Sequence, residues 1–250
     1  MTEDFELLRK RFLELARRSD EGHYFSFTDF LGLAEQSALK ECDLRGYRYR
    51  LFGGAEGAER VIARFGDWEE LGYEADFPIS CLLVCPRSEK FADRLTHRDF
   101  LGALLNLGIE REVLGDIVLR ENRAYIFVLD NMAEYILGSL ERVKRTDVRV
   151  TLAEELPEGE LYRTEKRTIQ LSGERIDAVV AKTFSLSRDD AQSLITRRTV
   201  YVNGALCESV SHTPRTSDII SVRGKGRLIY RGVTGTTRKG KLSVTIEVYV

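Results

Sequence analysis

The sequence predicts an α+β protein with an N-terminal α/β region, a middle ferredoxin-like domain and a small C-terminal α+β domain. Three observations lead to this prediction. The chain has 250 residues, 43% of them hydrophobic, which is enough for more than one packed core. Between residues 78 and 152 the apolar patterns follow the order β-α-β-β-α-β, the ferredoxin-like arrangement. A turn-rich acidic linker, 153–166, then precedes a C-terminal third of different charge.

Charge divides the chain near this linker. Residues 165–250 hold 15 Lys or Arg against 8 Asp or Glu, a net charge of +7, although the whole chain has a net charge of −2. Residues 1–164 are therefore acidic, with a net charge of −9. A basic part joined to an acidic part indicates a module that binds a polyanion.

The N-terminal α/β region is expected to cover residues 1–77. Its helices are predicted from apolar residues spaced three and four apart, and its strand precedes a pair of glycines. The expected elements, in order, are a helix over 3–18, a second helix from about residue 28, a strand over 47–52, a turn at 53–54 and a helix over 55–65. In the last of these helices, Val61, Ile62 and Phe65 would face inward.

The middle domain, 78–152, carries clear boundary signals. Thr96 and Asp99 form a capping-box pattern that opens a helix, and Gly108 supplies its stop. The expected elements are a strand over 79–85, a helix over 96–107, hairpin strands over 117–120 and 124–129, a helix over 130–141 and a strand over 148–151.

The third strand of this domain resembles an RNA-binding signature. In RNA-recognition motifs that strand carries the RNP1 consensus, and here Arg123 to Asp130 agrees with it at four of eight positions. Alternation along a strand puts Tyr125 and Phe127 on one face, where they could stack on bases. Arg123, Tyr125 and Phe127 are therefore a possible second RNA surface. The alternative is that the two aromatic residues pack beneath another element, because the first strand lacks a matching aromatic residue.

The C-terminal third predicts two short helices on a hairpin-rich sheet. The first helix covers 175–182, and Ser187 with Asp190 forms a capping box for the second. Asn203-Gly204 is a strong hairpin signal after a strand over 200–202. Residues 231–250 are expected to form a basic β extension.

These elements carry a chain of spaced matches to a known domain. The matching segments are Arg175-Ile176-Asp177, Leu186-Ser187-Arg188, Ala191-Gln192, Leu194-Ile195, Val202-Asn203-Gly204 and Asp218-Ile219-Ile220-Ser221-Val222-Arg223. Residues 167–230 thereby resemble the small RNA-binding domain first known from ribosomal small-subunit protein four, here called the S-four domain.

The S-four resemblance implies which residues contact RNA. That family meets structured RNA with its two helices, through phosphates and shape. By resemblance the RNA-binding residues are Arg175, Lys182, Ser187, Arg188, Gln192, Arg197, Arg198, Asn203, Arg223, Lys225 and Arg227. The family usually has Gly where this chain has Arg198, and often where it has Ser217. A left-handed backbone at these positions costs a non-Gly residue about 1 kcal/mol, so reshaped turns are expected.

Upstream segments narrow the resemblance further. Residues 95–104, Leu107-Gly108-Ile109, Gly115-Asp116-Ile117 and the basic run 223–227 resemble the YlmH proteins of Gram-positive bacteria and their cyanobacterial and plastid relatives. The resemblance implies a non-enzymatic RNA-binding protein of ribosome-associated quality control. Its partner would be ribosomal RNA of the large subunit near peptidyl-tRNA, with tRNA itself as a further candidate.

The alternative is an RNA-modifying enzyme, or a tRNA-binding regulator, that uses the S-four domain for docking. Against an enzyme, only about 23 residues follow Arg227, and no synthetase signature precedes the domain. His97 beside Asp99 is the one candidate general base next to a carboxylate, and its place in a first helical turn favours a capping role. We expect no catalytic residues.

Other classes of site and location are not indicated. Four cysteines without a CxxC pair and three scattered histidines predict neither a metal site nor disulfides. We expect no cofactor and no small-molecule substrate. No apolar run is long enough for a membrane span and the first residues are acidic, so the expected protein is a cytoplasmic monomer without a membrane partner.

Overall fold

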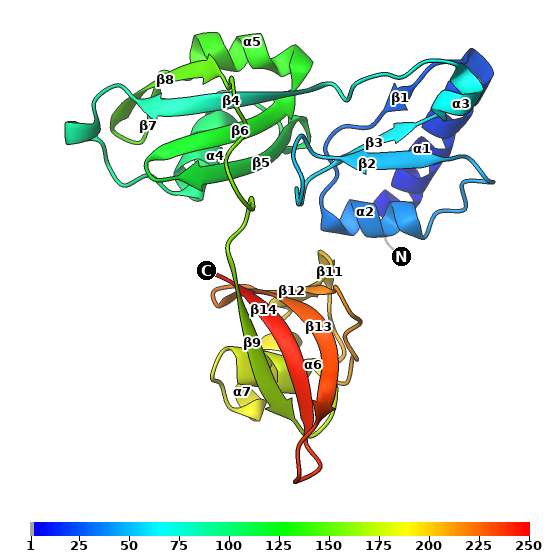
Figure 1. Cartoon of the computed structure of the whole chain (residues 1–250), viewed down its shortest axis with the longest axis vertical. Helices are drawn as coiled ribbons and strands as arrows, with labels where there is room; N and C mark the ends of the chain where they lie inside the picture. Colours follow the sequence, from blue (N-terminus) through cyan, green and yellow to red (C-terminus); the bar gives the residue numbers. More distant parts are fainter. Residues whose placement is uncertain (1–2) are drawn as a thin grey trace. The chain divides into compact units, whose positions relative to one another are not determined.

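The computed structural model describes residues 3–250 and divides the chain into two compact units, Met1–Leu161 and Tyr162–Val250. Both units combine helices with antiparallel strand pairs (Figure 1), which confirms the α+β class. The first unit contains both the N-terminal region and the middle domain.

The N-terminal region is a three-stranded sheet of order β1-β3-β2 with helices beside it. Its elements are α1 (Glu3–Gly22), β1 (Ser26–Phe27), α2 (Leu33–Lys40), β2 (Tyr49–Phe52), β3 (Ile62–Phe65) and α3 (Trp68–Leu71). Phe12 of α1 and Phe65 of β3 are fully buried in one cluster. The amphipathic pattern of α1 therefore predicted its buried face correctly.

Two predictions for this region were wrong. The expected helix over 55–65 is a turn followed by β3, the central strand, and all four residues of β3 are buried. A short apolar run that is buried on both faces has the same composition as a buried helix segment, so its spacing did not distinguish them. The second helix begins at Leu33 instead of residue 28, because Thr28 and Leu31 pair with the segment around β3.

The middle domain has the predicted β-α-β-β-α-β order, with one short strand added. Its elements are β4 (Ile79–Pro86), α4 (His97–Asn106), β5 (Leu114–Arg120), β6 (Arg123–Leu129), α5 (Asp130–Ser139), β7 (Arg142–Val143) and β8 (Thr146–Leu152). The sheet order is β5-β6-β4-β8-β7, so β6 lies between the strands β4 and β5 that α4 connects, and β4 lies between β6 and β8. Thr96 and Asp99 form the expected capping box at the start of α4.

A buried junction joins the N-terminal region to the middle domain. The Arg60 guanidinium donates to the carbonyl oxygens of Leu114 at 2.7 Å, Phe30 at 2.9 Å and Arg111 at 3.0 Å. Asp116, only 3% exposed, accepts from the Glu59 amide at 2.6 Å. These bonds satisfy charged groups that would otherwise be costly to bury, so the junction is specific.

The acidic linker does not run free of the middle domain. The Ala153 amide donates to the Cys81 carbonyl at 2.8 Å, and Arg120 donates to the carbonyls of Glu158 at 3.2 Å and Glu160 at 2.6 Å. Figure 1 shows this segment passing over the strands of the middle sheet. We call residues 153–161 the linker strap. The next strand, β9, begins at Thr164, inside the expected linker.

The C-terminal unit is a six-stranded sheet of order β11-β10-β12-β13-β14-β9 with two helices. Its elements are β9 (Thr164–Leu171), α6 (Ile176–Thr183), α7 (Arg188–Thr196), β10 (Val200–Val202), β11 (Ala205–Leu206), β12 (Ile219–Val222), β13 (Gly226–Thr236) and β14 (Leu242–Tyr249). The expected boundary at residue 230 falls inside β13. The last twenty residues therefore belong to this sheet, because β14 pairs along its length with both β13 and β9.

Candidate nucleic-acid interface

The predicted residues of α6 and α7 meet at a buried carboxylate. Asp177, fully buried in the first turn of α6, accepts from Arg175 Nε and Nη2 at 3.2 Å each. It also accepts from Arg188 Nε at 3.1 Å and from Gln192 Nε2 at 2.9 Å. One acid thus sets the positions of three predicted RNA-binding side chains. We call the five residues Arg175, Lys182, Ser187, Arg188 and Gln192 the α6–α7 surface.

The Asp177 carboxylate is held in its charged form. Burial raises its pKa, but the hydrogen bonds from Gln192, Arg175 and Arg188 and the charge of Arg188 outweigh this, so the pKa falls to about 2. The two arginine side chains remain 40% and 49% exposed. They are therefore oriented at one end and open to solvent at the other, which suits binding of a phosphate.

The remaining residues of this surface are accessible. Ser187 is the N-cap of α7, and its Oγ accepts from the Asp190 amide at 3.0 Å. Lys182 is exposed in the last turn of α6. Ser187 is thus occupied by capping the helix, and the solvent-exposed donors of the α6–α7 surface are those of Lys182, Arg175 and Arg188.

Arg197 and Arg198 lie at the end of α7, and both are exposed. Arg198 has φ +58° and pairs with Glu208 at 3.2 Å; Ser217 has φ +74°. Both positions keep the left-handed backbone that the family usually gives to Gly, so the expected reshaping of the turns did not occur. The strain stays in the chain, and Arg198 already has an acidic partner.

The Asn203 side chain makes two hydrogen bonds within its own hairpin region. Its Nδ2 donates to Asp218 at 2.8 Å, and its Oδ1 accepts from the Ile219 amide at 2.9 Å. Both polar atoms of the side chain are therefore used to join the turn after β10 to the start of β12. Asn203 therefore stabilises the turn, and its contact with RNA stays a prediction.

Arg223, Lys225 and Arg227 belong to a different surface from the two helices. Leu228 and Tyr230 point into the core under α6 and α7, so alternation along β13 sends Arg227 to the opposite face. Arg227 lies over the ring of Tyr249, and Arg223 lies over the ring of Tyr201. The predicted RNA residues are thus divided between two faces of the unit.

The aromatic residues of β6 are mostly covered. Arg123 is exposed and Tyr125 is half-buried, but Phe127 is 1% exposed. A Cβ on Gly54 would collide with the Phe127 ring, and a Cβ on Gly115 would lie 2.9 Å from Phe127 Cβ. Phe127 packs against the N-terminal region and is not available to stack on a base, so the alternative of packing beneath another element holds for it.

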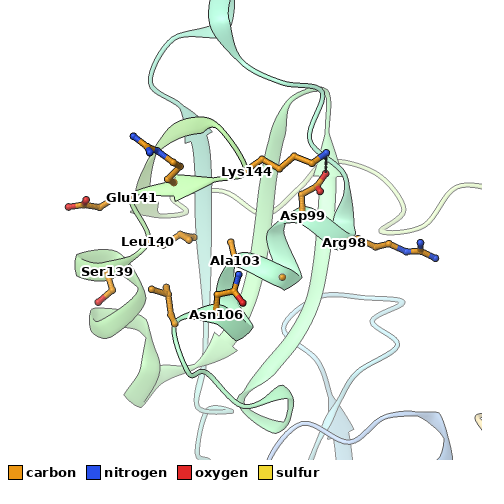
Figure 2. Close-up of a pocket in the computed structure, with 11 residues that line it drawn as sticks. Arg98, Asp99, Ala103, Asn106, Ser139, Leu140, Glu141 and Lys144 are labelled. Atoms are coloured by element: carbon orange, nitrogen blue, oxygen red, sulfur yellow. Dashed lines mark ion pairs between the residues drawn. The ribbon is translucent and has the colours of Figure 1, made fainter.

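A groove on the helix side of the middle domain is less suited to bind a nucleic acid than the α6–α7 surface (Figure 2). Ala103, Leu107 and Leu140 give it an apolar part. Lys144 faces Asp99 at 3.1 Å, while the Arg98 and Glu141 side chains point away from it in Figure 2. The charges at the groove are thus balanced or directed elsewhere, and the groove lacks the concentrated positive charge of the α6–α7 surface.

Sequence reasoning missed the residue that organises the α6–α7 surface and the tyrosines behind Arg223 and Arg227. Asp177 was part of the matching motif but was not selected, because its carboxylate contacts only become visible when α6 and α7 pack together. Tyr201 alternates with core residues in β10, which was an available signal.

Within residues 3–250, no group of three His, Cys, Asp or Glu residues could hold a metal ion. Of the helices in this part of the chain, none is long and apolar enough to cross a membrane.

Oriented arginines on a small α+β domain fit phosphates better than a small molecule, which places the chain in the class of nucleic-acid-binding proteins. Residues 73–156 match the family model described as "Putative RNA-binding domain in YlmH". The "Ribosome-associated protein quality control protein P2" of Bacillus subtilis (strain 168) is 30% identical over an alignment of 249 residues, which covers 94% of this chain and 91% of that protein. The chain belongs to the YlmH family of RNA-binding proteins.

A solved structure with this family name is also similar. The "Cell division protein ylmH from Streptococcus pneumoniae" is 23% identical and gives a TM-score of 0.49, covering 61% of this chain and 93% of that one.

Proposed function

We propose that this protein binds structured ribosomal RNA of the large subunit through its α6–α7 surface and acts in ribosome-associated quality control. The observation that carries the proposal is the Asp177 network, which orients Arg175 and Arg188 before any ligand arrives. Pre-oriented side chains lose less entropy on binding, so the pair is suited to two neighbouring phosphates. The name of the Bacillus subtilis relative, a ribosome-associated quality control protein, supports the same setting.

The proposed contact lies near peptidyl-tRNA, as the family resemblance implies. We also propose that the protein acts by binding without catalysis. The position of the candidate general base supports this absence of catalysis. His97 lies at the exposed start of α4, where Asp99 is engaged by Thr96 and Lys144.

Co-sedimentation with purified large ribosomal subunits tests the site. We expect Arg175→Ala/Arg188→Ala to raise the Kd at least tenfold, since each charge-assisted bond to phosphate is worth roughly 1.5–3 kcal/mol. The salt dependence should flatten by about 0.7–0.9 log units per lost phosphate contact. A double variant that still co-sediments undiminished would refute the assignment.

The matched control is Arg167→Ala/Arg238→Ala, which removes the same charge from exposed positions of the same unit. Equal losses in both variants would mean that bulk charge, and not the Asp177 network, determines binding. Circular dichroism checks that each variant is folded. Incubation of ribosomal RNA with the protein, followed by nucleoside analysis, tests the non-enzymatic statement; a new modified nucleoside would overturn it.

A further inference from the structure

The C-terminal sheet has a second ordered surface on the side that α6 and α7 leave uncovered. The register places Tyr201 opposite Ser221 and Ser221 opposite Arg227, and Arg227 lies beside Tyr249 at the next strand. The row therefore crosses β10, β12, β13 and β14. In Figure 1, α6 lies behind β13 and β14, so the opposite face of these two strands is turned toward the reader. We call Tyr201, Arg223, Arg227 and Tyr249 the tyrosine–arginine face.

Arginine and tyrosine side chains are stacked on this face. Arg223 Cζ lies 4.8 Å from the centre of the Tyr201 ring, and Arg227 Cζ lies 5.0 Å from the centre of the Tyr249 ring. Tyr162 meets Tyr249 edge to face, with ring centres 5.7 Å apart. Arg227 Nε also donates to Ser221 Oγ at 3.2 Å. These contacts hold the guanidinium groups over the rings, where cation–π attraction stabilises them.

The face is positively charged. Strand alternation and the turn after β12 place five basic residues on or beside it: Lys166, Arg223, Lys225, Arg227 and Arg231. The acid that the register places there is Glu247, which Arg231 pairs at 2.7 Å. With that pair set aside, Lys166, Arg223 and Lys225 still give the face positive charge, so a partner with negative charge is favoured.

Two features together identify the chemistry of the partner. A nucleobase has a flat face that stacks on tyrosine rings or on guanidinium planes, and its phosphate is attracted by the surrounding cations. A duplex keeps its bases stacked inside, so only unpaired nucleotides can use such a face. An acidic peptide would match the charge but has no flat groups to match the rings.

We propose that the tyrosine–arginine face binds unpaired nucleotides of single-stranded RNA, as a second contact separate from the α6–α7 surface. The proposal rests on the proposed function only in taking RNA as the partner. The two surfaces would let one small unit hold structured RNA on its helices and a neighbouring single strand on its sheet. This division explains why the predicted basic residues lie on two faces.

The test measures binding of the full-length chain to a fluorescein-labelled uridine 12-mer by fluorescence anisotropy. We expect Tyr201→Leu/Tyr249→Leu to raise the Kd between about fivefold and 100-fold, the range for loss of one stacked base. Tyr201→Phe/Tyr249→Phe keeps the rings and should bind within about twofold of the unchanged protein. If the double leucine variant does not fold, the single variants Tyr201→Leu and Tyr249→Leu each provide the measurement.

The outcomes separate this inference from the proposed function. Affinity for large subunits should survive the leucine changes better than affinity for the 12-mer, and the reverse should hold for Arg175→Ala/Arg188→Ala. Leucine variants that bind the 12-mer as tightly as the unchanged protein would overturn the proposal for the tyrosine–arginine face and leave the proposed function intact. A glutamate 12-mer peptide that binds as tightly as the uridine 12-mer would assign the face to acidic peptides instead. An unchanged protein that binds neither RNA would overturn both proposals.

Discussion

The α6–α7 surface and the β6 strand of the middle domain are both predicted from sequence to contact RNA, yet their structures differ. In the first, Arg175 and Arg188 stand half-exposed on a buried acid. In the second, Phe127 lies under the N-terminal region, and the linker strap is bonded to Arg120 on the neighbouring strand β5. The first surface leaves its charged side chains open to solvent, whereas part of the second is used to join pieces of the same chain.

The difference shows which sequence signals predict an exposed surface. Charged side chains on short helices stay exposed unless they find internal partners, because burying a charge is expensive. An aromatic residue on a strand can serve equally well as core or as a stacking platform. Tyr125 and Phe127 satisfied the alternation rule, but alternation says nothing about what covers a face.

The largest expected effect is loss of the Asp177 charge. Asp177→Asn leaves Arg175 and Arg188 without their shared anion, so we expect the free energy of unfolding of the C-terminal unit to fall by about 2–3 kcal/mol. Large-subunit affinity should fall at least tenfold, since the arginines lose their orientation. Hydrogen exchange of α6 amides and co-sedimentation measure the two effects.

Asp189→Asn is the matched control, because Asp189 is an exposed acid in the first turn of α7. It should change stability by no more than about 0.5 kcal/mol. Acid unfolding gives a second check. The folded pKa of Asp177, about 2, lies below its ordinary 3.8, so its stabilisation is present above pH 3.8 and lost as pH falls through 2. Asp177→Asn should lack this part of the acid transition; an unchanged transition would contradict the network.

A smaller effect is expected where the middle domain is covered. Gly54 has φ +94°, and a Cβ there would meet the Phe127 ring; Gly57 has φ +77° with nothing within 4 Å. Both Gly54→Ala and Gly57→Ala should lose about 1 kcal/mol to backbone strain. Only Gly54→Ala should lose about 1–3 kcal/mol more through overpacking. Denaturant unfolding of the two variants measures the difference, and equal losses would mean that Phe127 is not packed there.

Much of the fold followed from local sequence signals. The capping box of Thr96 and Asp99 and the glycine at 108 set the ends of α4, so the β-α-β-β-α-β order was predictable. β3 was not, because its burial on both faces depends on strands β1 and β2 from elsewhere in the region. Alternation of apolar and polar residues reveals a strand with one buried face, but a central strand that is buried on both faces shows no such alternation.

The same limit applies to the candidate site. Arg175, Arg188 and Gln192 were predictable as surface residues from motif spacing. Their common partner, Asp177, was not predictable. It accepts hydrogen bonds from Arg188 and Gln192, eleven and fifteen residues further along the chain, and these bonds form only when α6 and α7 pack together. The tyrosine–arginine face required the register of four strands. The parts of the site that could not be predicted from sequence are therefore those that depend on contacts between distant segments.

The smallest expected effect concerns Tyr125, and it tests the comparison most directly. Leu83 and Val118 stand opposite Tyr125 on its neighbouring strands, and Phe127 beside it is buried, so no second exposed ring accompanies it among the described β6 residues. We expect Tyr125→Leu to change affinity for the uridine 12-mer by less than about twofold, whereas a stacking residue would change it at least about fivefold. Tyr249→Leu, measured beside it, supplies the larger effect. A fivefold or greater loss of affinity in Tyr125→Leu would show that the middle sheet is open to RNA after all. Removing a half-buried ring can weaken binding by that much only if a base stacks on it.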